Sequence, residues 1–289
     1  MSQRIVLALG LSLIQSPPKE IVYKYLEGTF FWIVKLGMQI SSYDPCLLCT
    51  KEGSETFGIT ALQTDDTFSF ATLAFSQKEQ QQLDLAGFRA KPKDVLTPKK
   101  ALKFNRGRIK QSDNNSIRFT QKGQAKQLQA APTAKDIEEL NVRIHPLNLF
   151  YTKLFIFTDG SFANDKDMTL QLGFIIVLST ESRTRSEFTV RGNIIHWSST
   201  KCKQVTRSVL ASELYGMVAG FNSAIALSTT VRKIFEQLDI TAIPVVICLD
   251  SKSLYECLVK LGTTQEKQLI IDIISIREAY ENREVSEVR

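Results

Sequence analysis

The order of apolar runs in the second half of the sequence most tightly constrains how this chain can fold. The predicted elements are strands at 154–158, 172–179 and 188–197, a helix at 205–238, a strand at 244–249, and helices at 251–261 and 266–280. A long helix between β-rich runs favours a mixed sheet with helices covering it. This half therefore predicts a mixed α/β fold.

The long predicted helix carries one apolar stripe. Its members recur at steps of three or four residues, namely Leu210, Leu214, Met217, Phe221 and Ile225. Such spacing places them on a single face that packs against the sheet. Glu213 lies three residues after Leu210 and four before Met217, so it falls on the same face.

Two predicted strands run directly into an aspartate. The run at 154–158 is followed by Asp159-Gly160, and the run at 244–249 is followed by Asp250-Ser251. If these strands are parallel neighbours, both carboxylates lie at the carboxyl edge of the sheet, where open α/β sheets place their sites. Glu213 would join them from the helix.

Three converging carboxylates repel one another, and divalent cations remove that repulsion. The chemistry best served is two-metal phosphodiester hydrolysis, in which one metal activates water and the other stabilises the leaving oxygen. Each residue alone also has an ordinary structural interpretation. Asp159 could be a turn residue, Asp250 a helix N-cap and Glu213 a half-exposed helix residue.

Four short motifs carry a family resemblance over residues 154–289. They are TDGSF at 158–162, HWSS at 196–199, SELYGM at 212–217 and LDSKSL at 249–254. In this order they resemble the RNase H domain of copia-type retrotransposon polyproteins, especially the fungal ones. The resemblance implies an RNase H-like mixed sheet with covering helices. It also implies that Asp159, Glu213 and Asp250 hold two Mg²⁺ ions, or Mn²⁺, and cut the RNA strand of an RNA–DNA hybrid.

The first half predicts two hairpins, at 56–75 and 102–120, separated by a helix at 76–86. The motifs at 36–38, 42–48 and 62–67 resemble the late palm of a copia-type reverse transcriptase. In that family the pair Asp65-Asp66 binds metal. The segment from Phe104–Gly107 through Thr120-Gln121 resembles the hairpin that leads towards the thumb, so the fold expected is a partial palm ahead of the RNase H-like domain.

Positive charge is concentrated between Arg89 and Lys126. This window holds twelve Lys and Arg against two Asp, within a chain of net charge +6. A concentrated positive region suits a polyanion such as a nucleic acid, although charge runs are also common on solvated faces. The residues expected to bind nucleic acid are Lys99, Lys100, Lys103, Arg106, Arg108 and Lys110.

We expect a partial reverse transcriptase at 1–130, a linker at 131–152 and the RNase H-like domain at 153–289. The polymerase's third aspartate would lie before Met1, so polymerisation by this chain alone is not expected. The family's fourth RNase H carboxylate would follow Arg289, and no motif assigns that role to Glu284 or Glu287. The sequence thus suggests a polyprotein fragment, truncated at its C-terminus.

Two other functions remain open. One is an inactive nucleic-acid-binding remnant with the same fold, and the other is an integrase-like transferase, although the helix carrying Glu213 argues against the latter. Five sparse cysteines favour a reducing compartment. The run Ile5–Ile14 resembles a signal peptide but lacks a clean cleavage site. We expect an intracellular protein, cytoplasmic or nuclear and not secreted, that works with the rest of its polyprotein and no membrane.

Overall fold

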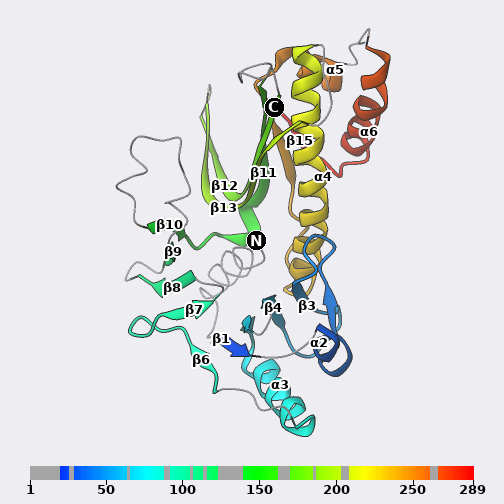
Figure 1. The fold of residues 1–289 in the computed structure, drawn as a ribbon. Coiled ribbons are helices and arrows are strands. Elements are labelled where there is room, and N and C mark those ends of the chain that lie inside the picture. The colour runs from blue at the N-terminus through cyan, green and yellow to red at the C-terminus, as the bar shows by residue number, and fades with distance from the viewer. Residues whose placement is uncertain are drawn as a thin grey trace. The chain divides into compact units, whose positions relative to one another are not determined.

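The structure is a computed structural model of the 289-residue chain. It describes residues 20–25, 29–63, 66–87, 92–104, 107–112, 116–122, 139–161, 170–184, 187–202, 208–260 and 266–289. The chain divides into two compact units (Figure 1). The first unit comprises Met1–Leu149 and Lys233–Ile240, and the second comprises Phe150–Arg232 and Thr241–Arg289.

A five-stranded mixed sheet forms the centre of the second unit. Its strands are β11 (Thr152–Ser161), β12 (Gln171–Arg183), β13 (Phe188–Lys201), β14 (Val245–Cys248) and β15 (Glu287–Val288). Their spatial order is β13-β12-β11-β14-β15. The first three pair antiparallel as a meander, whereas β14 pairs parallel to β11 and β15 pairs parallel to β14. The parallel neighbours expected from the two strand–aspartate junctions are therefore confirmed.

Three α-helices accompany this sheet. They are α4 (Val209–Glu236), α5 (Lys252–Val259) and α6 (Ile270–Glu281), with the short helix η4 (Lys267–Leu269) leading into α6. Figure 1 shows α4, α5 and α6 grouped on one side of the β11–β15 sheet. Serine side chains fix two helix starts, because Ser208 accepts a hydrogen bond from the Ala211 amide and Ser251 accepts one from the Leu254 amide.

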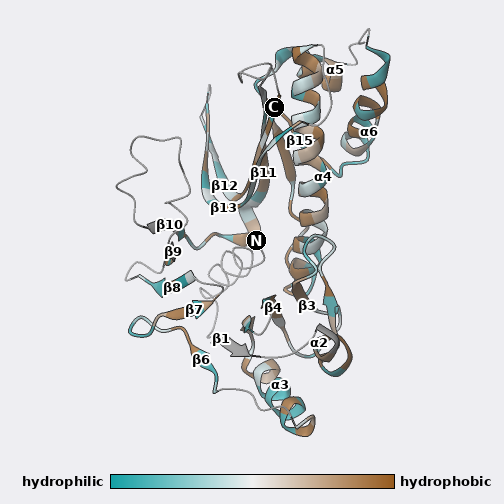
Figure 2. Ribbon diagram, in the orientation of Figure 1, coloured by the Kyte–Doolittle hydropathy of each residue, from teal (hydrophilic) through white to brown (hydrophobic). Residues whose placement is uncertain are grey.

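The long helix α4 is the core helix of this fold. Leu214, Met217 and Phe221 are buried, as the apolar stripe predicts, while Leu210 and Ile225 are partly exposed. Much of α4 appears in the brown of hydrophobic residues in Figure 2. Its length and composition alone would suffice to cross a membrane, but 56% of the apolar window is buried inside the protein. Burial of this kind is typical of a helix that covers a sheet.

An antiparallel meander, a long helix and two added parallel strands make the second unit an RNase H-like mixed α/β fold. The predicted strand and helix order is confirmed throughout the described residues. The strands β12 and β13 extend well beyond the predicted runs, to 13 and 14 residues. Their outer ends are polar, so hydrophobicity alone does not reveal them.

An ion-pair network joins the first, second and last strands of the sheet. Lys153 contacts both Glu181 and Glu287, at 3.0 Å each. Arg289 contacts the same two carboxylates at 2.6 Å, and its guanidinium lies 4.9 Å from the centre of the Phe188 ring. Since β15 has two residues, these side chains add to the few hydrogen bonds that hold it.

A six-stranded sheet forms part of the first unit. Its strands are β1 (Glu20–Tyr25), β2 (Met38–Ile40), β3 (Leu47–Thr50), β4 (Gly58–Gln63), β5 (Asp66–Ala71) and β6 (Asp94–Val95), in the order β2-β3-β4-β5-β1-β6. The helices are α2 (Thr29–Leu36) and α3 (Leu73–Leu85). Trp32, Met38 and Phe75 are buried in a shared core. The predicted run Ile5–Ile14 lies outside the described residues.

The predicted hairpin at 56–75 is confirmed as β4 and β5, which pair antiparallel. Its end was predicted wrongly, because Leu73–Phe75 begin a helix instead of continuing the strand. The side chain of Thr72 accepts a hydrogen bond from the Phe75 amide, and this N-cap turns the chain into α3. Helix propensity read from hydrophobic runs alone cannot detect that capping interaction.

The second predicted hairpin, at 102–120, is a larger sheet than expected. Four strands pair antiparallel in chain order, namely β7 (Leu102–Phe104), β8 (Gly107–Gln111), β9 (Ile117–Lys122) and β10 (Glu139–Ile144). What was predicted as one strand, 102–110, is two, because Leu102–Phe104 pairs antiparallel with the strand that begins at Gly107, and Gly107 lies against the Phe119 ring. A side chain at Gly107 would lie 2.4 Å from the Phe119 ring. Strand β10 lies within the stretch predicted as a linker.

Candidate metal centre

Two of the three predicted carboxylates lie on neighbouring parallel strands. Asp159 is near the end of β11, and Asp250 follows β14 by two residues. The parallel register pairs Phe157 with Cys248, so the two aspartates reach the same edge of the sheet. This is the edge formed by the carboxyl ends of the parallel strands, where α/β sheets commonly bind their ligands.

Glu213 reaches the same edge from the first turns of α4. The amide of Gly160 donates a hydrogen bond to its Oε2 at 3.2 Å. The adjacent Ser212 donates from its Oγ to the Gly160 carbonyl, also at 3.2 Å. The peptide groups flanking Gly160 are therefore held by α4 on both sides, and this contact fixes where Glu213 stands relative to β11.

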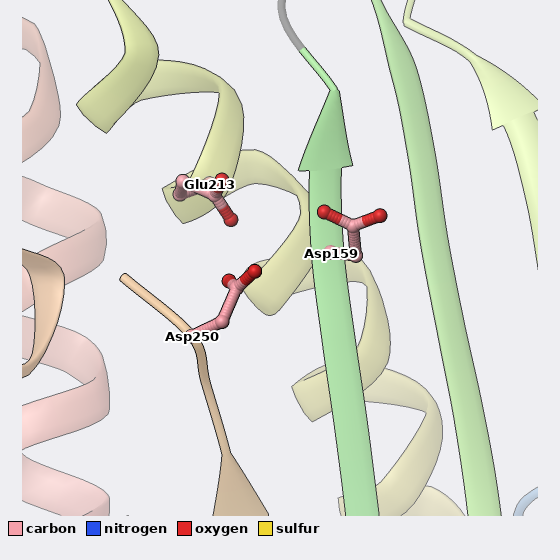
Figure 3. Close-up of side chains that lie close together, drawn as sticks. All are labelled: Asp159, Glu213 and Asp250. Atoms are coloured by element: carbon pink, nitrogen blue, oxygen red, sulfur yellow. The ribbon is translucent and has the colours of Figure 1, made fainter. Parts of the chain in front are cut away.

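The three carboxylates form one cluster. Each offers an oxygen, and these oxygens lie within 4.8 Å of one another. Figure 3 shows the carboxyl groups of Asp159, Glu213 and Asp250 turned toward a common space. Glu213 is half-buried, whereas both aspartates are exposed. The space between them is thus open on one side, as a site that receives a ligand from solution requires.

Two glycines allow α4 to approach β11 so closely. A β-carbon on Gly160 would lie 2.3 Å from the Ser212 carbonyl oxygen, and one on Gly216 would lie 2.9 Å from the Asp159 carbonyl oxygen. Real β-carbons do not approach main-chain atoms so closely. Any side chain at either position would push the helix away from the strand, and Glu213 with it.

The sequence interpretation missed these supporting residues. Ser212, Gly216 and Gly220 recur every four residues on α4, so a stripe of small side chains runs beside the apolar stripe. Gly220 also packs closely, with its hypothetical β-carbon 2.9 Å from Thr158. A search for small residues at helical spacing would have revealed the face on which helix and strand touch.

The environment of Glu213 favours its neutral form when no cation is bound. Burial, with the nearby carboxylates of Asp250 and Asp159, raises its pKa from 4.5 to about 7. The hydrogen bond from the Gly160 amide opposes this rise. A carboxylate held beside two others at partial burial is an electrostatically unfavourable arrangement that a bound cation would relieve.

The donor set fits a hard divalent cation. All three candidate ligands are carboxylates, and oxygen donors suit Mg²⁺ and Mn²⁺ better than softer metals. The separation of their oxygens allows one ion to touch all three. Among the described residues this is the one group of three or more acidic, histidine or cysteine side chains with such proximity.

The acids near the chain's end do not join this cluster. Glu287 is engaged by Lys153, Arg183 and Arg289. Glu284 is exposed and is not part of the carboxylate group. Within the described residues the candidate centre therefore has three carboxylates.

The remaining predicted site residues lie in the first unit. Asp66 begins β5 and is half-buried, whereas Asp65 and Arg106 lie outside the described residues. Lys99, Lys100, Lys103, Arg108 and Lys110 are exposed. Lys103, Arg108 and Lys110 lie on β7 and β8, but Lys99 and Lys100 belong to a turn, where Lys100 pairs with Asp94. The predicted basic set is thus divided between two local structures.

Neither a protein-family model nor a curated protein sequence matches this chain. Solved structures resemble part of it. One is the structure of LC11-RNase H1, a protein isolated from compost, in complex with an RNA/DNA hybrid. Its sequence is 15% identical to this chain, the TM-score is 0.32, and the match covers 47% of this chain and 81% of that one.

Two further structures are similar to the same extent. RNase H1 from Halobacterium salinarum has 13% identity and a TM-score of 0.32, covering 47% of this chain and 83% of that one. The N-terminal RNase H domain of a Mycobacterium tuberculosis protein, fused to maltose-binding protein, has 16% identity and a TM-score of 0.31, covering 48% and 79%. The fold of the second unit is defined by its own strand order, described above.

Proposed function

We propose that the second unit is a ribonuclease H-type endonuclease that hydrolyses the RNA strand of RNA–DNA hybrids with Mg²⁺ or Mn²⁺. The observation that carries this proposal is the convergence of Asp159, Glu213 and Asp250 at the carboxyl edge of an RNase H-like sheet. A cluster of carboxylates open to solution on one side suits a phosphodiester substrate, whose own charge requires cations to approach it.

All three carboxylates would bind the cations in this proposal. Asp159 and Asp250, which are exposed, would also face the substrate. Glu213 accepts a hydrogen bond from the Gly160 amide, so it would offer a ligand of fixed position. Cations bound there supply activation of water and stabilisation of the leaving oxygen. Selectivity for RNA would come from the hybrid's shape and the 2′-hydroxyl.

We further propose that the chain derives from a retroelement polyprotein and that the first unit is a partial reverse-transcriptase palm. We also propose that the protein acts inside the cell. The motif order quoted above supports this, together with the antiparallel pairing of β4 with β5, in which Asp66 is the first residue of β5.

The decisive experiment titrates Mg²⁺ and Mn²⁺ into the whole protein with a labelled RNA–DNA hybrid. Asp159→Asn should abolish cutting of the RNA strand, while hybrid binding stays the same or tightens because a negative charge is lost. A DNA duplex of equal sequence serves as the substrate control. Equal cleavage by the parent and Asp159→Asn would show that the assignment is wrong.

A binding-only remnant is the second candidate. The observation that favours it is the three-carboxylate cluster, with Glu287 engaged in ion pairs instead of joining the centre. Its signature would be salt-sensitive binding of the hybrid, with no cleavage by the parent or by Asp159→Asn in Mg²⁺ or in Mn²⁺. The integrase-like alternative would instead join DNA ends, and gel electrophoresis of the labelled products distinguishes that reaction from RNA cleavage.

A further inference from the structure

Asp250 is the candidate metal ligand whose own side chain has the least support. Glu213 accepts a hydrogen bond from the Gly160 amide, and Asp159 lies within β11, where it pairs with Gly173. Asp250 instead follows β14 in an exposed position, and within the described residues no hydrogen bond reaches its carboxylate. Figure 3 shows it on a narrow segment of chain that follows a strand. The main chain on either side of Asp250 must therefore fix where its carboxylate stands.

The main chain around Asp250 is anchored once on each side. On the carboxyl side, the Ser251 side chain accepts a main-chain hydrogen bond at the start of α5. On the amino side, the Leu249 amide donates to the Arg289 carbonyl at 2.9 Å. The Arg289 amide in turn donates to the Ile247 carbonyl, also at 2.9 Å. The second anchor therefore depends on where Arg289 is held.

The side chain of Arg289 is held by strands other than its own. It is 16% exposed, and its two terminal nitrogens contact the two carboxylate oxygens of Glu181, at 2.6 and 3.1 Å. Its Nε donates to Glu287 at 2.9 Å, and the guanidinium lies 4.9 Å from the centre of the Phe188 ring and 5.6 Å from that of Phe155. Bidentate carboxylate pairs and aromatic contacts both restrict the orientation of a guanidinium. This side chain thus ties the residue after β15 to β11, β12 and β13.

These contacts form a continuous path from the ion-pair network to the metal centre. The guanidinium fixes Arg289, the Arg289 carbonyl fixes the Leu249 amide, and Leu249 directly precedes Asp250. Two residues of β15 pair with β14, so few main-chain hydrogen bonds would hold Arg289 without its side chain. Loss of contacts that support a metal ligand typically lowers metal affinity by roughly 10- to 100-fold.

We propose that Arg289 is a positioning residue for the candidate metal centre, because its guanidinium determines the place of Asp250 through the Leu249 amide. Arg289 is not itself a ligand, since a guanidinium has no acceptor atom to offer a cation. The inference rests on the proposed function only in that Asp250 binds a cation, and it does not depend on whether RNA is cut.

The test compares Arg289→Met with Arg183→Met in the whole protein. Methionine keeps an unbranched apolar side chain and removes the guanidinium. Arg183 is the matched control, because it contacts the same two carboxylates, Glu181 and Glu287, but lies at the end of β12, where its main chain pairs with β13. Calorimetric titration measures the Mn²⁺ affinity of each protein, at a temperature where circular dichroism shows it folded.

Arg289→Met should bind Mn²⁺ about tenfold or more weakly than the parent, whereas Arg183→Met should stay within about twofold of it. Hydrogen exchange in EDTA gives a second readout that needs no metal. The Leu249 amide should exchange about tenfold faster in Arg289→Met, while the amide of Ile176, in the middle of β12, keeps the parent rate. Arg289→Lys, which keeps the charge but loses the bidentate contact, should give intermediate values.

Equal Mn²⁺ affinities in the parent and Arg289→Met would overturn the proposal. Equal losses in Arg289→Met and Arg183→Met would also overturn it, because the effect would then belong to the charge of the network. If Arg289→Met does not fold, Arg289→Lys is judged by the same criteria. The expected differences without cutting of an RNA–DNA hybrid would support this proposal and refute the proposed nuclease, whereas a parent that binds no Mn²⁺ would overturn both the proposal and the metal centre.

Discussion

At the scale of residues, the candidate metal centre depends on main-chain contacts as much as on carboxylates. Asp159, Glu213 and Asp250 come from a strand, a helix and a loop, and no side chain links them directly. Their separation follows from the approach of α4 to β11 at Gly160 and Gly216. Geometry at a metal site of this kind must hold to within a few tenths of an ångström.

Gly216→Ala should weaken Mn²⁺ binding by about tenfold or more, the range typical of lost support for a metal ligand. The added β-carbon would lie 2.9 Å from the Asp159 carbonyl oxygen and force the helix away. Gly173→Ala is the matched control, because its β-carbon would meet the same oxygen at 3.6 Å, an ordinary contact. Isothermal calorimetry measures both affinities, and equal affinities would contradict the role of Gly216.

Glu213 should give the metal-free protein a particular dependence of stability on pH. Its pKa is about 7 in the fold against an ordinary 4.5, so its favourable contribution is complete below pH 4.5 and is lost as pH rises through 7. In EDTA the parent should therefore lose stability relative to Glu213→Gln between pH 5 and pH 8, by at most about 3 kcal/mol.

Chemical denaturation at several pH values measures that difference. Saturating Mg²⁺ at pH 8 should reverse it, because the cation then favours the ionised carboxylate that only the parent has. Glu256→Gln, on the exposed side of α5, is the control and should show no such trend. If the difference in free energy of unfolding between the parent and Glu213→Gln stays constant from pH 5 to pH 8, the pKa of Glu213 is not raised in the fold.

The three acidic positions could be predicted from sequence because each follows from a local pattern. Asp159 and Asp250 end apolar runs, and Glu213 interrupts an apolar stripe. The hydrogen bond from Gly160 to Glu213 could not be predicted, since it joins residues 53 positions apart. Local patterns specify which residues face the sheet, whereas the distance between helix and strand follows from packing.

At the scale of elements, β15 depends on side chains outside its own two residues. Glu181 is nearly buried, at 6% side-chain exposure, and contacts Lys153, Arg183 and Arg289. Its partners come from β11, β12 and the residue after β15. Removal of this carboxylate would leave cations close together with one fewer opposite charge, which is costly in a partly buried place.

Glu181→Gln should lower the free energy of unfolding by about 2 to 3 kcal/mol. Glu256→Gln is the control, because its pair with Lys260 is exposed on α5 and should cost less than about 0.5 kcal/mol. Urea denaturation followed by circular dichroism gives both values. Similar small losses in the two variants would show that the network contributes no more than an ordinary surface pair.

Prediction of elements from the sequence succeeded where hydrophobicity changes sharply and failed where the signal is tertiary. The runs that became β11, β12, β14 and α4 are strongly apolar or periodic. The division of 102–110 into β7 and β8 is set by antiparallel pairing, and the close fit of Gly107 against the Phe119 ring on β9 is a tertiary contact that no local pattern reveals. The position of Arg143 beside Arg118 also could not be predicted, because the two residues meet only through the pairing of β10 with β9.

At the scale of the whole molecule, the chain consists of two units with separate sheets. The three carboxylates of the candidate metal centre all belong to the second unit. A metal ion bound there should therefore stabilise the second unit more than the first.

Calorimetry of the whole protein should show two unfolding transitions, and Mn²⁺ should raise only one of them. At a concentration one hundred times the dissociation constant, the stabilisation is about 2.7 kcal/mol. Asp159→Asn should remove the Mn²⁺ response and leave both transitions present. A single transition that moves as a whole with Mn²⁺ would show that the chain unfolds as one cooperative body.

The close approach of α4 to β11 also bears on how related sequences should be judged. A chain that keeps all three carboxylates but gains one methyl group at Gly160 or Gly216 is expected to bind metal poorly, since the helix can no longer reach the strand. Intact acidic motifs are therefore an incomplete sign of a working centre, and the two glycines, which offer no ligand of their own, should be inspected beside them.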